Sequence, residues 1–224
     1  MITYHPEVTQ GSDEWLAMRR GILTASEMNR IITPTLKIAG NDKSRAHELE
    51  IAAQRISGYV EPHYVGDDML RGMEDEFYAR QLYADHYAPV TETGFITNDK
   101  LGFLVGYSPD GLVGDDGLIE VKSRRQRFQI ETIASCEVPA EYMIQLQTGL
   151  LVTERQWIDF ISYSGGLPMF VQRVEPDPEI QEAIIAAARA FEVRVEEKML
   201  EYRASVVSRK LIPTERRVEQ EMFV

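Results

Sequence analysis

Residues 106–128, GYSPDGLVGDDGLIEVKSRRQRF, bring turn formers, acidic residues and a block of arginines together in one short stretch. The segments 101–107 and 118–123 that flank its centre are apolar enough to form strands. The residues between them are rich in Pro, Gly and Asp, which favour turns. We therefore expect a hairpin, in which Asp115 and Asp116 belong to the turn and carry no chemistry.

Glu120 and Lys122 lie two residues apart on the second strand, so their side chains project from the same face of the sheet. The hairpin brings Asp110 beside them. Two carboxylates that meet in this way repel each other unless a cation lies between them. Their hard oxygens suit Mg²⁺ or Mn²⁺, with the backbone carbonyl of Val121 as a further donor. Lys122 would then orient or deprotonate a water, which is an arrangement suited to phosphodiester hydrolysis.

A simpler interpretation makes this segment a surface hairpin in which Glu120 and Lys122 form an exposed ion pair. Against it stand Pro109, directly before Asp110, and the apolar neighbours of the pair. Ile119 and Val121 are typical of a buried strand, so a freely solvated Glu120 is not expected.

The rest of the chain predicts helices and strands in an order typical of α/β or α+β proteins. Cap residues and apolar periodicity predict helices over residues 13–18, 24–32, 46–57, 69–86, 139–152 and 177–204. Further strands are expected over residues 90–97, 155–163 and 168–175. Thr24 to Glu27 match a capping box. The apolar stripe of the last helix consists of Ile180, Ile184, Ala187, Phe191, Val195, Met199 and Tyr202.

Composition sets broad limits on the class of protein. The chain has 224 residues, which suits one large domain or two small ones. Its formal net charge of −12 argues against a surface coated with phosphate-binding cations. A basic groove inside an acidic exterior remains compatible with that charge. The single Cys136, the absence of a signal-peptide pattern and the absence of a membrane-spanning run lead us to expect a cytoplasmic protein. Four histidines share no spacing that predicts a metal site: His5, His47, His63 and His86.

Four motifs in order extend the pattern beyond the hairpin. They are GSDEWLAMRRGILTASE (11–27), LRGMEDEFYARQLY (70–83), GYSPDG with IEVK (106–122) and AEYMIQLQTGLLVT (140–153). Together they resemble the phage lambda exonuclease family, the YqaJ-like viral recombinases of the PD-(D/E)XK nuclease superfamily. The resemblance implies a restriction-endonuclease-like core, a central mixed β-sheet flanked by helices, in a single nuclease domain over residues 1–224 with a charged tail from 205.

The resemblance also implies roles for individual residues. Asp110 and Glu120, with the carbonyl of Val121, would hold the metal, and Lys122 would be the catalytic lysine. Glu76 matches the helix glutamate that faces the metal-bound water. A pocket for a 5′-phosphate would be formed by Arg19, Ser26, Ser108 and Gln145, with Gln147 as the alternative glutamine.

The phosphate pocket also makes physical sense. A helix that starts at Thr24 would offer free N–H groups to a phosphate, Ser26 adds a hydroxyl, and Arg19 can bind phosphate with two N–H groups. The simpler alternative is a set of helix caps and a solvated helix face. Arg124 and Arg125 follow the acidic site directly; a solvated strand end and a clamp for the DNA backbone are both open for them.

The function implied by the resemblance is Mg²⁺-dependent digestion of one strand of linear double-stranded DNA from its 5′ end. The product would be a 3′ single-stranded tail for recombination with a single-strand annealing protein. A homotrimer ring around the DNA is implied as well, in a bacterial or phage-infected cytoplasm. Two alternatives remain: a site-specific or structure-specific endonuclease with the same site, and a DNA-binding module without catalysis.

Overall fold

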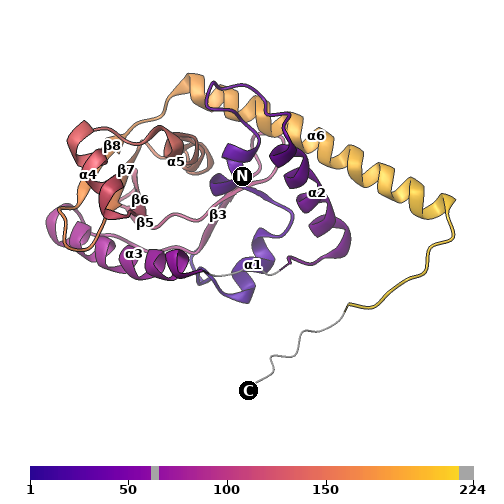
Figure 1. Ribbon diagram of the computed structural model, residues 1–224, viewed down its shortest axis with the longest axis horizontal. Helices are drawn as coiled ribbons and strands as arrows, with labels where there is room; N and C mark the ends of the chain where they lie inside the picture. Colours follow the sequence, from indigo (N-terminus) through magenta and orange to yellow (C-terminus); the bar gives the residue numbers. More distant parts are fainter. Residues whose placement is uncertain (62–65, 217–224) are drawn as a thin grey trace, which may run out of the picture.

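The computed structural model describes residues 1–61 and 66–216 of the chain (Figure 1). His63 therefore lies outside the described residues, as does the end of the charged tail. Residues 205–208 continue the last helix, and residues 209–216 form neither helix nor strand.

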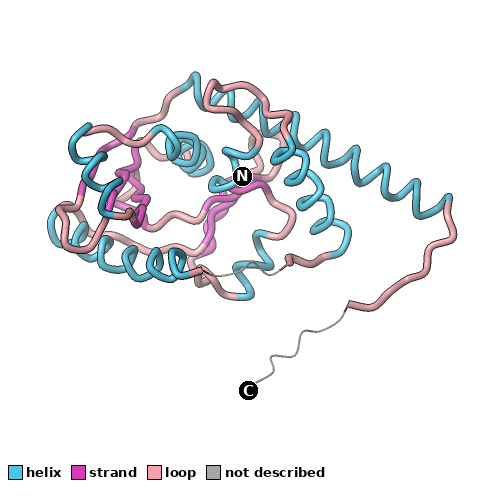
Figure 2. The backbone as a smooth tube through the Cα atoms, viewed as in Figure 1, coloured by secondary structure: helices cyan, strands magenta, loops and turns pink. Residues whose placement is uncertain are grey.

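The strands form two four-stranded sheets surrounded by helices (Figure 2). The first sheet has the order β1-β3-β4-β2, and its strands are β1 (Ile2–His5), β2 (Leu23–Thr24), β3 (Phe95–Asn98) and β4 (Val105–Tyr107). The second has the order β5-β6-β7-β8, and its strands are β5 (Gly111–Val113), β6 (Gly117–Ser123), β7 (Trp157–Tyr163) and β8 (Phe170–Val174). Each sheet combines parallel and antiparallel pairs. The mixed α/β fold is confirmed, with two sheets where one was expected.

The predicted pairing of residues 101–107 with 118–123 is wrong. β4 pairs with β2 and β3 in the first sheet, and the hairpin partner of β6 is the short β5. Pro109 lies between β4 and β5 and has no N–H to offer a ladder, so the chain leaves the first sheet there. The turn itself is where it was expected, and Gly114 takes the positive φ of 53° that it requires.

The described residues contain six α-helices and a short 3₁₀ helix. These are α1 (Asp13–Arg19), η1 (Ala25–Arg30), α2 (Asp42–Ser57), α3 (Asp67–His86), α4 (Gln126–Ser135), α5 (Ala140–Thr153) and α6 (Pro178–Ser208). Ser12 caps α1 by accepting from the Trp15 N–H at 3.2 Å. Asn41 caps α2 in the same way, so this helix begins four residues earlier than expected.

The capping box predicted at Thr24 is not formed. The segment that follows is a 3₁₀ helix, and Thr24 makes no side-chain cap to its backbone. Instead, the Thr24 hydroxyl donates to the Glu27 carboxylate at 2.7 Å. The hydroxyl is thereby held in a side-chain network that also includes Arg19 and Ser26.

Helices cover both faces of the second sheet. α3 packs on β6 and β7, where Ala79 and Tyr83 contact Ile119, Val121 and Ile161. The alternate residues of the same strands face the main core with α5 and α6. Because strand side chains alternate, Glu120 shares the α5 side of β6.

The apolar stripe of α6 is confirmed in its first part. Ile184, Phe191 and Val195 are buried, but Tyr202 is 50 % exposed, because the second half of α6 extends beyond the body of the protein (Figure 1). In the described ranges, 1–61 and 66–216, no helix has the length and apolar character that crossing a membrane requires.

One glycine permits a close approach of α5 to β4. A Cβ at Gly149 would lie 2.8 Å from the ring of Tyr107, too near for any side chain. The absence of a side chain there makes room for the Tyr107 ring beside α5.

Candidate active site

The three residues of the hairpin motif come together as expected. Gly111 pairs with Ile119, so Asp110 lies level with Glu120 across the hairpin. The Asp110 carboxylate accepts from the Val121 N–H at 2.6 Å. Glu120 is only 2 % exposed, so the alternative of an exposed surface pair does not apply.

The Glu120 carboxylate is held by donors from three elements. Lys122 Nζ donates to Oε1 at 2.8 Å, and Gln145 Nε2 on α5 donates to the same oxygen at 2.5 Å. Tyr107 on β4 donates its hydroxyl to Oε2 at 2.7 Å. Tyr107 was not predicted as a site residue, because a tyrosine within the apolar run LGFLVGY is typical of a core.

Gln147 lies outside this cluster. Its side chain donates to the Glu175 carbonyl at 2.8 Å and accepts from the Asp177 N–H at 2.8 Å, which fastens α5 to the start of α6. Two residues along a helix turn the side chain by roughly 200°, so only one of the two glutamines can face Glu120. The structure places Gln145 there, on the Glu120 carboxylate, and not in the group around Arg19 with which it was assigned to the phosphate pocket.

α3 adds a third carboxylate to the cluster. Glu76 accepts from Arg80, one turn further along the helix, at 3.1 Å. The same Arg80 nitrogen donates to the backbone carbonyl of Asp110 at 2.9 Å. Arg80 was missed by sequence analysis, because an arginine four residues after a glutamate is typical of any solvated helix face.

Burial and like charge govern protonation in this cluster. Burial raises the pKa of Asp110 well above its usual range, and the charges of Glu120 and Glu76 raise it further. Burial also raises the pKa of Glu76, while Arg80 opposes the shift. For Lys122, burial lowers the pKa, but Glu120 and Asp110 outweigh this effect and raise it overall. The cluster therefore favours a positive charge at its centre.

The donor chemistry fits a hard divalent cation. Within the described residues, no three His, Cys, Asp or Glu side chains converge into a complete metal cage. Mg²⁺ does not require one, since it commonly uses one or two carboxylates together with waters and substrate phosphates. Asp110 and Glu120 supply such a pair. The contribution of the Val121 carbonyl stays a prediction.

A second, cationic group lies around Arg19 on α1. Its guanidinium donates to the Ser108 hydroxyl at 3.4 Å and to the Thr24 hydroxyl at 3.3 Å. The Thr24 hydroxyl in turn lies 3.3 Å from that of Ser26. Arg19, Ser26 and Ser108 were assigned to one phosphate pocket. They lie close together, although Ser108 is distant from the other two in sequence.

Trp15 supports this cationic group. The Arg19 guanidinium lies 4.1 Å above its ring, and its indole N–H donates to Ser108 at 2.9 Å. The first contact follows from the sequence spacing, because residues 15 and 19 lie one above the other on a helix. The second joins segments distant in sequence and depends on the fold.

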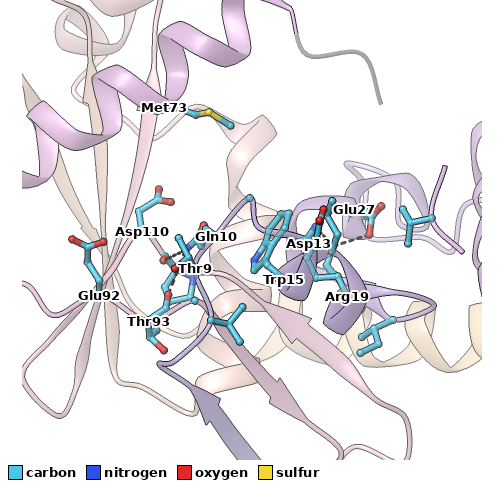
Figure 3. A pocket seen from close by; sticks show the side chains of 18 of the residues that line it. Thr9, Gln10, Asp13, Trp15, Arg19, Glu27, Met73, Glu92, Thr93 and Asp110 are labelled. Carbon is cyan, nitrogen blue, oxygen red and sulfur yellow. Dashed lines mark hydrogen bonds between the residues drawn. The ribbon is translucent and has the colours of Figure 1, made fainter. Parts of the chain in front are cut away.

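One cavity of about 1000 Å³ joins the two groups (Figure 3). Arg19 and Thr24 line one end, and Asp110 and Glu76 line the other. Trp15 and Gln10 lie between these ends, and Met73 lies on the α3 side (Figure 3). Glu120 and Lys122 are set behind Asp110 and are not part of the wall.

The arginines after the motif are divided between the interior and the surface. Arg124 has a side chain that is 8 % exposed; it binds Glu141 at 2.8 Å and the Tyr142 hydroxyl. It therefore does not lie on the surface as a clamp for the DNA backbone would. Arg125 is exposed and precedes α4, and a role for it in DNA binding stays a prediction.

Comparison with known proteins agrees with this geometry. The family model of the YqaJ-like viral recombinase domain matches residues 14–156. The structure of LHK-Exo, an alkaline exonuclease from Laribacter hongkongensis, is similar with a TM-score of 0.78 and 33 % sequence identity. That match covers 88 % of this chain and 99 % of the other. A second structure of LHK-Exo, in complex with dAMP, has a TM-score of 0.79 and 34 % identity over the same coverage.

A more distant structure shares the fold. The phage-related exonuclease from Haemophilus somnus 129PT has a TM-score of 0.59 at 16 % identity, and the match covers 81 % of this chain and 96 % of the other. None of the curated proteins compared with the chain matches it. The family match covers the hairpin motif, the cationic group on α1 and the glutamine on α5, and the chain therefore belongs to the YqaJ-like viral recombinase family.

Proposed function

We propose that this protein is a 5′-to-3′ exonuclease that degrades one strand of linear double-stranded DNA and leaves a 3′ single-stranded overhang. Its cofactor is Mg²⁺, for which Mn²⁺ can substitute, and one nuclease domain carries the activity. The observation that carries this proposal is the single cavity with Arg19 at one end and Asp110 at the other. The similarity to LHK-Exo, an alkaline exonuclease at 33 % identity, supports the reaction class.

The acidic end is suited to cleave the phosphodiester. Asp110 and Glu120 would hold the metal, with the Val121 carbonyl as a third oxygen. When bound, Mg²⁺ supplies charge stabilisation on the phosphoryl group and lowers the pKa of water. Lys122 Nζ, 2.8 Å from the Glu120 carboxylate, orients the attacking water. Glu76 accepts a hydrogen bond from this water. Gln145 keeps Glu120 in the orientation that this arrangement needs.

The cationic end is suited to select a 5′-phosphate. Arg19 presents a planar fork to phosphate oxygens, and the hydroxyls of Ser26 and Ser108 add neutral donors. Stacking on Trp15 fixes the orientation of the guanidinium. A strand anchored there by its terminal phosphate presents its first phosphodiester to Asp110, which sets the polarity. The complex of LHK-Exo with dAMP supports a site of nucleotide size.

Partners follow from the product and from the surface. A 3′ single-stranded tail is the substrate of a single-strand annealing protein, so we expect one as partner in a bacterial or phage-infected cytoplasm. Large apolar side chains are exposed on α3 (Leu70 and Phe77) and on the free half of α6 (Leu200 and Val207). Such patches favour association, here as a homotrimer ring around DNA. Light scattering of the purified protein tests this assembly.

Labelled DNA tests the activity. Linear duplexes carry a label at the 5′ or the 3′ end, with or without a 5′-phosphate, and a closed circular duplex is the control. Wild-type protein with Mg²⁺ should release the 5′ label first and leave circular DNA intact, and Asp110→Asn should be inactive. Cutting of the circle would instead favour the endonuclease. Binding of DNA without cleavage, in Mg²⁺ and in Mn²⁺, would favour a DNA-binding module.

A further inference from the structure

Arg80 contacts three separate parts of the acidic end. It lies on α3, and its side chain is 19 % exposed. Nη1 donates to Glu76 at 3.1 Å and to the Asp110 carbonyl at 2.9 Å, and Nη2 lies 3.5 Å from the Glu92 carboxylate. One planar group thereby joins α3, the connection between β4 and β5, and the segment before β3.

That connection depends on side chains for its shape. Residues 108–110 belong to no strand, so their carbonyls are not paired by a regular ladder. Gln10 donates to the Pro109 carbonyl at 2.8 Å, and Arg80 donates to the next carbonyl, that of Asp110. The Asp110 carboxylate is bound separately by the Val121 N–H. Asp110 is therefore held at its backbone by Arg80 and at its side chain by β6.

The charged groups around Asp110 are also divided between β6 and α3. Glu120 is paired with Lys122 on β6, and Glu76 is paired with Arg80 on α3. A lysine at position 80 would keep the charge, but its one nitrogen could not bind Glu76 and the Asp110 carbonyl as Nη1 does and also lie near Glu92 as Nη2 does. The position is thus specific for arginine by geometry as well as by charge.

We propose that Arg80 is a positioning residue for the metal: by binding the Asp110 carbonyl and Glu76 together, it fixes the Asp110 carboxylate relative to Glu120. This inference rests on the proposed function, since it takes Asp110 and Glu120 as the metal ligands. Arg80 acts through Asp110 and takes no part in the hydrolysis itself. Residues that orient metal ligands in this way control the affinity of the site.

Calorimetric titration with Mn²⁺, in the absence of DNA, tests the proposal. The proteins compared are wild type, Arg80→Lys, Arg80→Gln and the control Arg173→Lys. Arg173 is matched because it binds the buried Asp159 with two hydrogen bonds of 2.9 Å and does not line the cavity. Both Arg80 variants should bind Mn²⁺ about tenfold more weakly or worse, while Arg173→Lys keeps the wild-type affinity.

Cleavage assays supply a second readout. In the Arg80 variants, the Mn²⁺ concentration for half-maximal cleavage should rise while KM for DNA ends stays unchanged, and added Mn²⁺ should restore the rate. A general loss of packing would lower the melting temperature without moving the metal dependence. If Arg80→Gln does not fold, Arg80→Lys carries the test, since it keeps a long cationic side chain.

The outcomes separate this inference from the proposed function. Wild-type Mn²⁺ affinity in the Arg80 variants, or an equal loss in Arg173→Lys, overturns the role of Arg80. A wild-type protein that binds Mn²⁺ but cleaves no DNA overturns the proposed function, and Arg80 is then judged on the titration alone. A wild-type protein that binds no Mn²⁺ overturns both.

Discussion

The two ends of the cavity are built in opposite ways. At the acidic end, Glu120 is an acceptor surrounded by donors from β4, β6 and α5, all on rigid elements. At the cationic end, Arg19 is a donor supported by hydroxyls and by the face of Trp15. The acidic end is thus fixed by two sheets and the helices packed on them, whereas the cationic end depends on a side chain of one short helix and the groups around it. The chemistry requires the more rigid support, and recognition of an end tolerates the looser one.

Among the substitutions that test this difference between the two ends, the largest effect is expected from removal of the Lys122 ammonium group beside Glu120. Lys122→Ala should lower the rate of cleavage by about 10²- to 10⁴-fold, the range for loss of a positioned proton-transfer or water-orienting group. Binding of DNA should persist, because Arg19 is untouched. Single-turnover cleavage and fluorescence anisotropy measure the two effects. A near-wild-type rate would remove Lys122 from the mechanism.

The two glutamines of α5 sharpen the comparison within one helix. Gln145→Leu removes a donor to Glu120 and should reduce cleavage by about 10- to 100-fold with little loss of stability. Gln147→Leu is the matched control. It leaves the Glu175 carbonyl and the Asp177 N–H without their partner, so it should lower the free energy of unfolding by about 1–3 kcal/mol while activity at 25 °C persists.

These expectations are measured by urea denaturation beside cleavage rates. The opposite pattern, in which Gln147→Leu is the inactive protein, would contradict the assignment of Gln145.

At the cationic end the expected effect is smaller. Arg19→Ala should reduce the preference for 5′-phosphorylated over 5′-hydroxyl ends by about 1.5 kcal/mol, the lower value for a hydrogen bond to a charged group. Affinity for Mn²⁺ should not change, because Arg19 lies at the far end of the cavity (Figure 3). Competition between the two duplexes measures the preference. An unaltered ratio would separate Arg19 from the phosphate.

The smallest effect is expected at the hairpin turn. Asp115→Asn removes an exposed acidic side chain close in sequence to the motif. Stability should change by less than about 0.5 kcal/mol, as for most surface substitutions, and cleavage should be unaffected. A marked loss of activity, measured in the same assay, would mean that the turn contacts DNA.

Local signals in the sequence predicted five of the six α-helices of the described residues, but not α4. Ser12 and Gly114 determine a helix start and a turn through their own backbone preferences, so they are visible without a partner. The sequence did not show that β6 pairs with β5, where β4 was expected. Strand pairing depends on distant segments, here β2 and β3, that compete for β4.

The site divides along the same line. Asp110, Glu120 and Lys122 were predicted together because alternation along one strand and a turn define their positions. Arg80 and Tyr107 were not, since each joins the site through a contact between elements distant in sequence. Arg124 illustrates the reverse error: its position next to the motif suggested a surface clamp, but an acceptor on α5 holds it inside.

Gly149 influences the site from a distance. Its missing side chain makes room for Tyr107, whose hydroxyl binds Glu120. A single added methyl group would press on the tyrosine ring and, through it, on the carboxylate, although it would touch neither DNA nor metal. The same geometry offers a place to engineer graded nuclease variants without altering the surface that the substrate meets.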